Sequence, residues 1–277
     1  MGRNEHIDNK ITCRLSCPVC KMPLERVGGS LVCESRHTYD IARTGYVNLV
    51  NTSSQRESGD SEECVRARSA FLDFGGYAEF SRAVCRAAGT GEVCVDAGCG
   101  EGYYTTALAR SFSLTYGFDL SRASIVAASK RARAEGVFER AFFGVGSVYS
   151  LPMQDGSADV ITNIFAPCVE EEYKRVLRDS GILVVACAGE EHLSGLKSAL
   201  YDEVRVNTER RDLPVGMTHL SCEKVRYELT LDSPELIRAL YMMTPYAYRT
   251  SREAEARLFS LRRLSTLVDF DIHVYKK

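Results

Sequence analysis

The sequence predicts an α/β fold, a doubly wound parallel sheet with an antiparallel edge, preceded by a small metal-binding domain. From residue 92 onward, short apolar runs alternate with helical patterns, which is typical of a parallel sheet covered by helices. A glycine-rich turn directly follows the first of these runs, and four cysteines gather before residue 34. A length of 277 residues has room for both units.

The predicted elements follow one another in chain order. A buried strand at residues 93–95 runs into the glycine-rich turn, and residues 103–110 then form a helix. The elements that follow are a strand at 114–118, a helix at 121–135, strands at 141–145 and 158–165, a helix at 170–177 and a strand at 181–188. Alternating patterns at 225–231 and 268–274 predict the antiparallel pair at one edge.

Composition excludes several classes of protein. With 35 basic and 37 acidic residues, the chain is not a binder driven by a global positive charge. A hydrophobic content of 45%, with 11 Phe and 14 Tyr, excludes a disordered chain. The longest apolar run, residues 182–188, has the length of a strand, and the polar start shows no export signal. We therefore expect a soluble, cytoplasmic protein.

The early cysteines form a metal-ligand pattern. Eleven cysteines in a reducing compartment favour metal binding or catalysis over disulfides. Cys17, Cys20, Cys33 and His37 follow the spacing C-x2-C-x12-C-x3-H, which supplies three thiolates and one imidazole. This closed tetrahedral shell predicts a structural Zn²⁺. A redox CxxC would need a βαβ context, which the flanking sequence lacks, and Cys13 is a weaker alternative to His37.

The zinc ligands define the first of three segments. Gly28 and Gly29 predict a hairpin within residues 21–32 that returns the second ligand pair to the first. A polar module of about fifty residues needs the metal to fold. We predict a zinc-binding domain at 1–50, a linker and helices at 51–91, with the linker itself at 51–61, and the larger domain at 92–277.

The glycine-rich turn indicates the class of cofactor. A strand, a glycine turn and a helix place backbone N–H groups at a helix N-terminus. Here the glycines follow G-x-G-x-G rather than the G-x-G-x-x-G of dinucleotide sites, and Asp96 stands two positions before Gly98. A carboxylate there suits a ligand with an ammonium and a sulfonium, and Asp119, at the end of the next strand, suits a ribose diol. Together these residues resemble the S-adenosylmethionine site of class I, Rossmann-like methyltransferases.

Further motifs narrow the resemblance to one family. The zinc pattern is followed by Asp-Ile-Ala-Arg-Thr-Gly-Tyr-Val-Asn-Leu at 40–49, and Gly-Asp-Ser at 59–61 precedes Ala-Arg-x-x-Phe-Leu-x-x-Gly-x-Tyr at 67–77. Ala-Pro-Cys stands at 166–168, and Met-Thr-Pro-Tyr-Ala-Tyr-Arg at 243–249. Over nearly its whole length the chain resembles the bacterial 23S rRNA (guanine-N1)-methyltransferases, which modify a guanine in a hairpin loop.

The resemblance implies zinc ligands, a cofactor site and a substrate. The implied zinc ligands are the four residues of the early pattern, and the zinc domain would recognise RNA. Family resemblance and the class I pattern together give the cofactor-binding candidates Tyr77, Asp96, Gly98, Gly100, Tyr104, Thr105, Asp119, Ser147 and His192. The alternative is a methyltransferase for a small molecule or another RNA base, with the zinc module as a lid or a homodimer contact.

Guanine N1 carries a proton that must leave as the methyl group arrives. Asp60, Glu101 and His192 are candidate general bases by residue type. The sequence Asn-Ile-Phe-Ala-Pro at 163–167 departs from the Asn-Pro-Pro-Tyr of exocyclic-amine methyltransferases. Cys168, after Pro167, raises the rival hypothesis of a cytosine C5 nucleophile, although the partnering acid has no clear match.

Candidate RNA contacts are less specific. Tyr39, Arg43 and Tyr46 combine aromatic and basic character that could stack bases and hold phosphates. Alternatively, Tyr46 and Val47 form the small core of the zinc module. Five arginines between 249 and 263 predict a solvated helix face.

Overall fold

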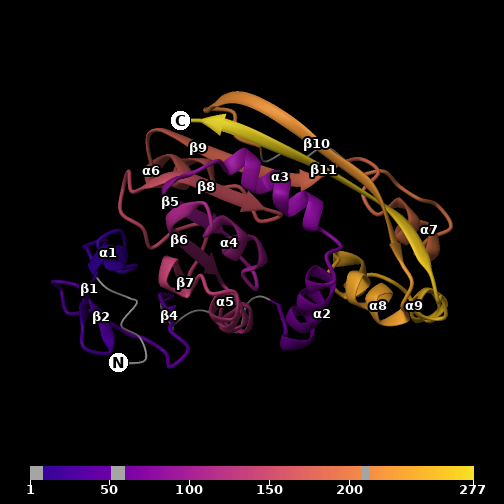
Figure 1. Cartoon of the computed structure of the whole chain (residues 1–277), viewed down its shortest axis with the longest axis horizontal. Coiled ribbons are helices and arrows are strands. Elements are labelled where there is room, and N and C mark those ends of the chain that lie inside the picture. The colour runs from indigo at the N-terminus through magenta and orange to yellow at the C-terminus, as the bar shows by residue number, and fades with distance from the viewer. Residues whose placement is uncertain (1–8, 51–59, 208–212) are drawn as a thin grey trace.

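The computed structural model describes residues 9–50, 60–207 and 213–277. Most of the predicted linker at 51–61, including Gly59 of the Gly-Asp-Ser motif, lies outside the described residues. The described chain forms an eight-stranded sheet in the order β10-β11-β9-β8-β5-β6-β7-β4 and a three-stranded sheet in the order β1-β2-β3 (Figure 1). No described helix is long and apolar enough to cross a membrane.

The large sheet confirms the predicted fold class. Its parallel strands are β5 (Gly91–Ala97), β6 (Phe112–Asp119), β7 (Ala141–Val145), β8 (Ala158–Ile164) and β9 (Leu177–Ala188). The strands β11 (Leu264–Lys276) and β10 (Thr218–Leu231) form the predicted antiparallel edge. Because β5 pairs with both β6 and β8, the strand order reverses beside β5, and a crevice opens there at the carboxyl ends of the strands.

The predicted helices are present with boundaries shifted by a few residues. They are α4 (Tyr103–Leu108), α5 (Arg122–Ala134) and α6 (Glu170–Val176). Ser121 caps α5, because its hydroxyl accepts a hydrogen bond from the Ser124 N–H. Short 3₁₀ helices lie at Phe138–Arg140 (η1) and Pro245–Tyr248 (η2).

Five further helices lie beside the sheet: α2 (Glu62–Asp73), α3 (Ala78–Ala88), α7 (Ser194–Leu200), α8 (Pro234–Met242) and α9 (Arg252–Phe259). Helices were predicted within 51–91 and for the arginines at 249–263, whereas α7 and α8 were not predicted. The helices α3 and α7 contact β11, and α2 packs against α8. Phe80 of α3 and Phe270 of β11 lie in the core between these helices and the sheet. The predicted solvated arginine face is only partly right, because Arg257 of α9 donates to the carbonyls at the end of α7, at 3.2 and 3.1 Å.

The N-terminal module consists of α1 (Asn9–Thr12) and the hairpin-like strands β1 (Glu25–Val27), β2 (Ser30–Val32) and β3 (Thr38–Asp40). The predicted turn between β1 and β2 is present, and Gly28 there has a left-handed φ of 61°. The chain then leaves the module as β4 (Val47–Asn48), which pairs in parallel with β7 at the edge of the large sheet.

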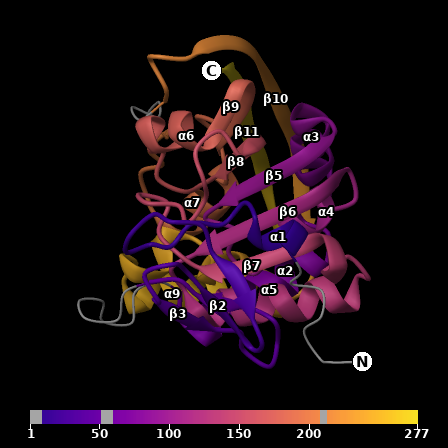
Figure 2. The same ribbon diagram turned by 90° about the vertical axis from the view of Figure 1, so that its left-hand side faces the viewer.

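The N-terminal module covers the other face of the sheet (Figure 2). Its buried Ile11, Leu15 and Leu31 belong to the same core as Val95 of β5 and Tyr116 of β6. The described connection at 146–157, between β7 and β8, contains no helix. The N-terminal module therefore covers the part of the sheet that a helix in this connection would cover. The Tyr46 and Val47 side chains are also buried, but they lie in cores shared with the large sheet rather than in a separate core of the zinc module.

Candidate functional site

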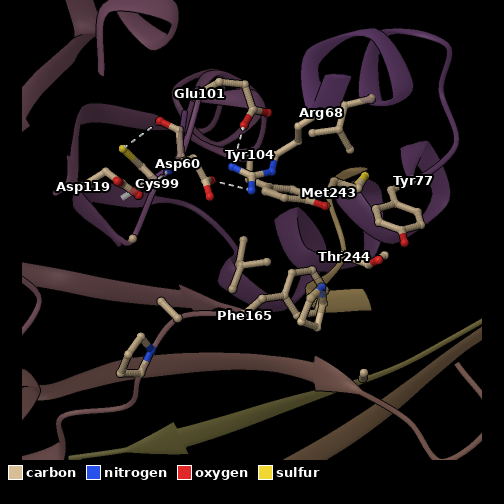
Figure 3. Close-up of a pocket in the computed structure, with 18 of the residues that line it drawn as sticks. Asp60, Arg68, Tyr77, Cys99, Glu101, Tyr104, Asp119, Phe165, Met243 and Thr244 are labelled. Atoms are coloured by element: carbon tan, nitrogen blue, oxygen red, sulfur yellow. Dashed lines mark hydrogen bonds and ion pairs between the residues drawn. The ribbon is translucent and has the colours of Figure 1, made fainter. Parts of the chain in front are cut away.

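A cavity of about 590 Å³ opens at the carboxyl ends of β5, β6 and β8 (Figure 3). Its size lies within the usual range for small-molecule sites. It is lined by the glycine-rich turn, the ends of β6 and β8, and residues of α2, η2 and the segment after β9. None of the lining residues that the structure describes comes from residues 9–50.

The glycine-rich turn lets the backbone approach the cavity closely. Gly98 has a φ of 84°, and a Cβ there would stand 2.5 Å from the Cβ of Ala166. Gly100 also has a positive φ, and both glycines line the cavity. Side chains at these two positions would be strained, and one at position 98 would also collide with Ala166 in the segment that follows β8. The turn therefore presents bare backbone to a ligand.

Asp119 ends β6 and lines the cavity. Its carboxylate accepts hydrogen bonds from the N–H of Gly100 at 3.0 Å and from the N–H of Ser121 at 2.8 Å. Burial raises the pKa of Asp119, and these two backbone donors oppose that shift. The carboxylate thus connects two loops and keeps further lone pairs for a ligand in the cavity.

Asp96 and Thr105, two predicted cofactor residues, lie behind the cavity wall. Neither is among the described residues that line the cavity. The buried Asp96 carboxylate accepts hydrogen bonds from the hydroxyls of Thr105 at 2.6 Å and Thr162 at 2.9 Å. These two hydrogen bonds connect α4 with β8 beneath the glycine-rich turn. The position of Asp96 on β5 directs its side chain toward the protein interior.

Asp96 makes the stability of the fold depend on pH. Burial raises its pKa from 3.8 to about 6, so between these values the folded state binds more protons than the unfolded state. The contribution of Asp96 to the free energy of unfolding is therefore fully present below pH 3.8. It is lost as the pH rises through about 6, and the loss is at most about 3 kcal/mol. We expect Asp96→Asn to remove this dependence. Chemical denaturation would measure the free energy of unfolding of the variant and of the wild type at pH 5 and pH 8. The variant should gain more stability relative to the wild type at pH 8 than at pH 5. An equal difference at the two pH values would contradict the prediction.

Tyr77 and His192 meet at the opposite end of the cavity from Asp119. The backbone N–H of Asp269 donates to Nδ1 of His192 at 3.2 Å, so the neutral ring carries its proton on Nε2. That Nε2 lies 3.4 Å from the Tyr77 hydroxyl and donates to it. Burial, with the charge of Lys197, lowers the pKa of His192 to about 3. Because the imidazole donates to the Tyr77 oxygen, the Tyr77 hydroxyl is free to donate its own proton to a different acceptor.

Two further predicted residues differ in their placement. Tyr104 lines the cavity, and its ring packs edge-on against Phe80 with centroids 5.6 Å apart. Ser147 is not among the described lining residues, although its neighbours Gly146 and Val148 are. The Ser147 hydroxyl instead accepts a hydrogen bond from the N–H of Tyr149 at 3.2 Å. The predicted contact of Ser147 with a ligand thus lacks support from its position.

Arg68 is a cavity residue that the sequence analysis did not select. Its guanidinium lies between the candidate bases Asp60, at 2.5 Å, and Glu101, at 3.8 Å (Figure 3). Burial raises the pKa of Glu101, and the charge of Arg68 opposes that shift. With Asp119 nearby, this end of the cavity has three carboxyl groups and one guanidinium. Its position within the Ala-Arg motif was the available signal.

Phe165 is the second residue that the sequence analysis did not select. It lies just after β8 with a φ of 58°, which is rare and strained for an aromatic residue. Its ring stacks on Phe80 at 5.5 Å, yet 46% of the residue is exposed at the cavity. Cys168, the rival nucleophile, is not among the described lining residues. An exposed aromatic face, rather than a thiol, therefore faces the cavity at this strand end.

The four predicted zinc ligands come together in the N-terminal module. One ligand atom from each of Cys17, Cys20, Cys33 and His37 lies within 4.8 Å of all the others. The Sγ atoms of Cys20 and Cys33 are 3.5 Å apart, and Nδ1 of His37 is 3.3 Å from Cys33 Sγ. Ligands of a tetrahedral zinc are about 3.5–3.8 Å apart, so the cluster fits this ion.

The surroundings of the cluster act in opposite directions on two of its thiols, because burial raises the pKa of Cys33 whereas the pKa of Cys20 is lowered. Hydrogen bonds, first the backbone bond from Met22 and then bonds from the other cluster residues, lower the pKa of Cys20 to about 6 despite desolvation. The hydroxyl of Tyr39 lies 3.1 Å from Cys17 Sγ. Cys13 is exposed and bonds to the Lys10 carbonyl instead, so the alternative shell with Cys13 is not formed.

Two family profiles match the chain. Residues 15–56 match a zinc ribbon described as RlmA, N-terminal, and residues 95–185 match a methyltransferase domain. The chain thus matches a zinc ribbon and a methyltransferase domain, whose cofactors are Zn²⁺ and S-adenosylmethionine.

Curated relatives match most of the chain. It is 34% identical over 241 residues to the 23S rRNA (guanine(748)-N(1))-methyltransferase of Streptomyces fradiae, covering 82% of this chain and 84% of that protein. It is 28% identical to YxjB of Bacillus subtilis strain 168, named as a candidate 23S rRNA (guanine-N(1)-)-methyltransferase, over 94% of this chain and 96% of that one. A protein of Micromonospora griseorubida with a similar name is 36% identical over 67% of this chain and 69% of its own length.

Proposed function

This chain belongs to the bacterial 23S rRNA (guanine-N1)-methyltransferase family, and from that premise we propose how its residues perform the reaction. The chain transfers a methyl group to N1 of a guanine in a hairpin loop of 23S rRNA. The position named for the Streptomyces fradiae relative, guanine 748, is the target we propose here. We propose a cytoplasmic location, because the proposed substrate is ribosomal RNA.

The cavity beside the glycine-rich turn carries this proposal. S-adenosylmethionine supplies the methyl group on a sulfonium, and a pocket rimmed by Asp60, Glu101 and Asp119 suits its positive charge. Asp119 would hold the ribose hydroxyls, while Gly98 and Gly100 give the ligand close access to backbone. Asp96 and Thr105 act as positioning residues beneath the turn, because they hold its two flanks together.

Tyr77 would donate its hydroxyl proton to an acceptor of the bound cofactor. The chain of hydrogen bonds from Asp269 through His192 sets this direction. It also makes His192 unsuitable as a general base, because its one lone pair already accepts from the backbone. The proposal therefore assigns the guanine N1 proton to a carboxylate, Asp60 or Glu101, and a weak base suffices when the leaving group is a sulfonium.

The variant His192→Gln tests this assignment. We expect an approximately tenfold weaker cofactor affinity and a turnover rate within about tenfold of the wild type, because the residue orients Tyr77 and moves no proton. Steady-state kinetics and cofactor titrations at several pH values would measure the two effects separately. If turnover instead fell by about three orders of magnitude, with the acidic limb of the pH profile abolished, His192 would be restored as the base.

Phe165 would form the platform on which the target guanine stacks. An unpaired base can leave its stack for an aromatic face, and such stacking contributes about 1–3 kcal/mol per base. Phe165→Ala should therefore raise the KM for RNA by about 5- to 150-fold and leave cofactor affinity unchanged, whereas Phe165→Tyr should behave like the wild type. An unchanged KM for RNA in Phe165→Ala would contradict this role.

The zinc ribbon would bind the RNA hairpin at nucleotides other than the guanine that is methylated. We propose Cys17, Cys20, Cys33 and His37 as its zinc ligands, in a domain at 1–50 that is followed by linker and helices at 51–91 and a methyltransferase domain at 92–277. Arg43 is exposed on this module and would contact phosphates. Because the described module residues do not line the cavity, their contacts are with RNA outside the methylation site.

Primer extension tests the proposed reaction directly. The protein is incubated with 23S rRNA lacking the modification and with radiolabelled S-adenosylmethionine, and the RNA is then reverse-transcribed. Since N1 methylation blocks base pairing, a new stop next to guanine 748 is expected. A stop at another hairpin guanine would move the target, and label found only in small molecules would refute the RNA substrate.

A further inference from the structure

A second group of metal-ligand side chains lies on the antiparallel edge of the large sheet. The strands β9, β11 and β10 place Cys187, Asp271 and Cys222 near two of the five histidines of the chain, His219 and His273. Asp271 pairs across the strands with Cys187, and His273 pairs with Cys222. Side chains two residues apart on a strand share a face, so Asp271 and His273 point to the same side.

The ligand atoms of this edge cluster are near enough to one another for small side-chain rotations to form a coordination shell. One ligand atom from each of Cys187, Asp271 and His273 lies within 4.8 Å of the other two. The two remaining residues adjoin His273, whose Nδ1 is 3.3 Å from His219 Nε2 and whose Nε2 is 3.9 Å from Cys222 Sγ. Whichever nitrogen of His273 coordinates, a fourth ligand is therefore at hand.

One atom of the edge cluster is under-satisfied in the described structure. Oδ1 of Asp271 is buried and has no hydrogen-bond partner among the described residues, although the Lys224 ammonium stands 3.6 Å away. A buried carboxylate oxygen normally accepts a hydrogen bond, and the Lys224 ammonium pairs with this one by charge without hydrogen-bonding to it. A metal ion bound by the neighbouring thiolate and imidazole would coordinate this oxygen directly.

We propose that the edge cluster is a second binding site for a divalent transition metal of the zinc class. Cys187, Asp271 and His273 supply one sulfur, one oxygen and one nitrogen, and His219 or Cys222 completes the shell. The thiolate and carboxylate together neutralise the 2+ charge. The site is independent of the proposed methyl transfer, because Cys187, Asp271 and His273 are not among the described residues that line the catalytic cavity.

The edge site should bind more weakly than the zinc ribbon. His219 and Cys222 are exposed, whereas two of the ribbon thiols are buried, and the edge ligands come from three strands rather than from tight turns. Exposure to water and the need to adjust side chains both reduce affinity. We therefore expect a mild chelator to remove this metal first.

Metal analysis of the full-length protein tests the proposal. The protein is equilibrated with Zn²⁺ alone, desalted and analysed by mass spectrometry for metal content per chain. Two equivalents are expected for the wild type and one for Cys187→Ser and for His273→Ala, with the affinity of the second site reduced at least 100-fold. Cys13→Ser, which removes an exposed cysteine away from both clusters, is the matched control and should retain two.

A second measurement, by absorption spectroscopy, distinguishes the loss of the metal site from misfolding of a variant. With Co²⁺ in place of Zn²⁺, thiolate coordination produces charge-transfer absorption, and the wild type should show more of it per chain than Asp271→Asn or Cys187→Ser. Cofactor binding by the variants checks that they fold. A wild type that binds one equivalent, or a folded His273→Ala that still binds two, would overturn the proposal.

Discussion

Cys33→Ser is expected to abolish zinc binding and to destabilise the whole chain, not the N-terminal module alone. Cys33 and Cys17 are buried in the same hydrophobic core as Val95 and Tyr116 of the large sheet. Zinc binding contributes about 10–16 kcal/mol to the folding of isolated zinc-finger peptides. If about 5 kcal/mol of this stabilises the shared core, the melting temperature should fall by about 10–20 °C.

The same variant should weaken cofactor binding, although no described module residue lines the cavity. The connection at 146–157 lies between the two, because its backbone bonds to the module at Ser16 and Arg14, at 3.0 and 2.9 Å. On its other side, Gly146, Val148 and Tyr149 line the cavity. A module that unfolds would therefore release one wall of the cofactor site.

Calorimetry, metal analysis and cofactor titration of Cys33→Ser would measure these effects, with Cys13→Ser as the control. Cys13 is exposed, and its loss should leave all three quantities unchanged. A chelator should reproduce the effect of Cys33→Ser, whereas a reductant should not, because none of the described cysteines forms a disulfide. If the melting of the large domain were unchanged in Cys33→Ser, zinc would stabilise the module only.

Asp119→Ala should lower the affinity for S-adenosylmethionine by at least about 100-fold. The substitution removes the acceptor for the N–H groups of Gly100 and Ser121, and with it the proposed partner of the ribose hydroxyls. Each hydrogen bond to a charged group contributes about 1.5–3 kcal/mol, and two buried N–H donors would be left unpaired. The effect should therefore combine a lost contact with a loosened glycine-rich turn.

Isothermal titration calorimetry with S-adenosylmethionine would measure this loss. Asp119→Asn keeps one carbonyl oxygen as an acceptor and should bind more tightly than Asp119→Ala but less tightly than the wild type. Asp73→Asn is the matched control, because Asp73 is a half-exposed carboxylate of α2 that pairs with Arg131 at 2.6 Å outside the cavity. Wild-type affinity in Asp119→Ala would remove Asp119 from the cofactor site.

Local patterns in the sequence account for much of the fold and for the metal ligands. The strands at 93–95, 114–118 and 141–145 follow from runs of apolar residues, and the glycine-rich turn follows from the backbone that it requires. The zinc ligands are close in sequence, so their spacing alone restricts which residues can meet. For such features the relevant residues lie close together in the chain, and the zinc ligands extend only from Cys17 to His37.

Which residues line the cavity is decided by packing between elements that are distant in the sequence. Asp96 and Thr105 have suitable residue types, yet their strand and helix positions direct them to each other behind the cavity wall, whereas Arg68 and Phe165 are brought to it. No pattern at 162–168 indicates that Phe165 takes a left-handed φ. Side-chain direction at a strand end is decided by neighbouring strands and helices.

By itself, the sequence predicted the two units, the zinc ligands and the class of cofactor from residue type and short spacing, and it indicated the family through a resemblance over nearly the whole chain. Only the tertiary structure showed that the zinc module shares its core with the sheet, and that Arg68 lies between two candidate bases. It alone also brought Cys187 and His273 together, across 85 residues that separate them in the chain. Contacts of this kind arise when strands pair and layers pack, and no local pattern encodes them.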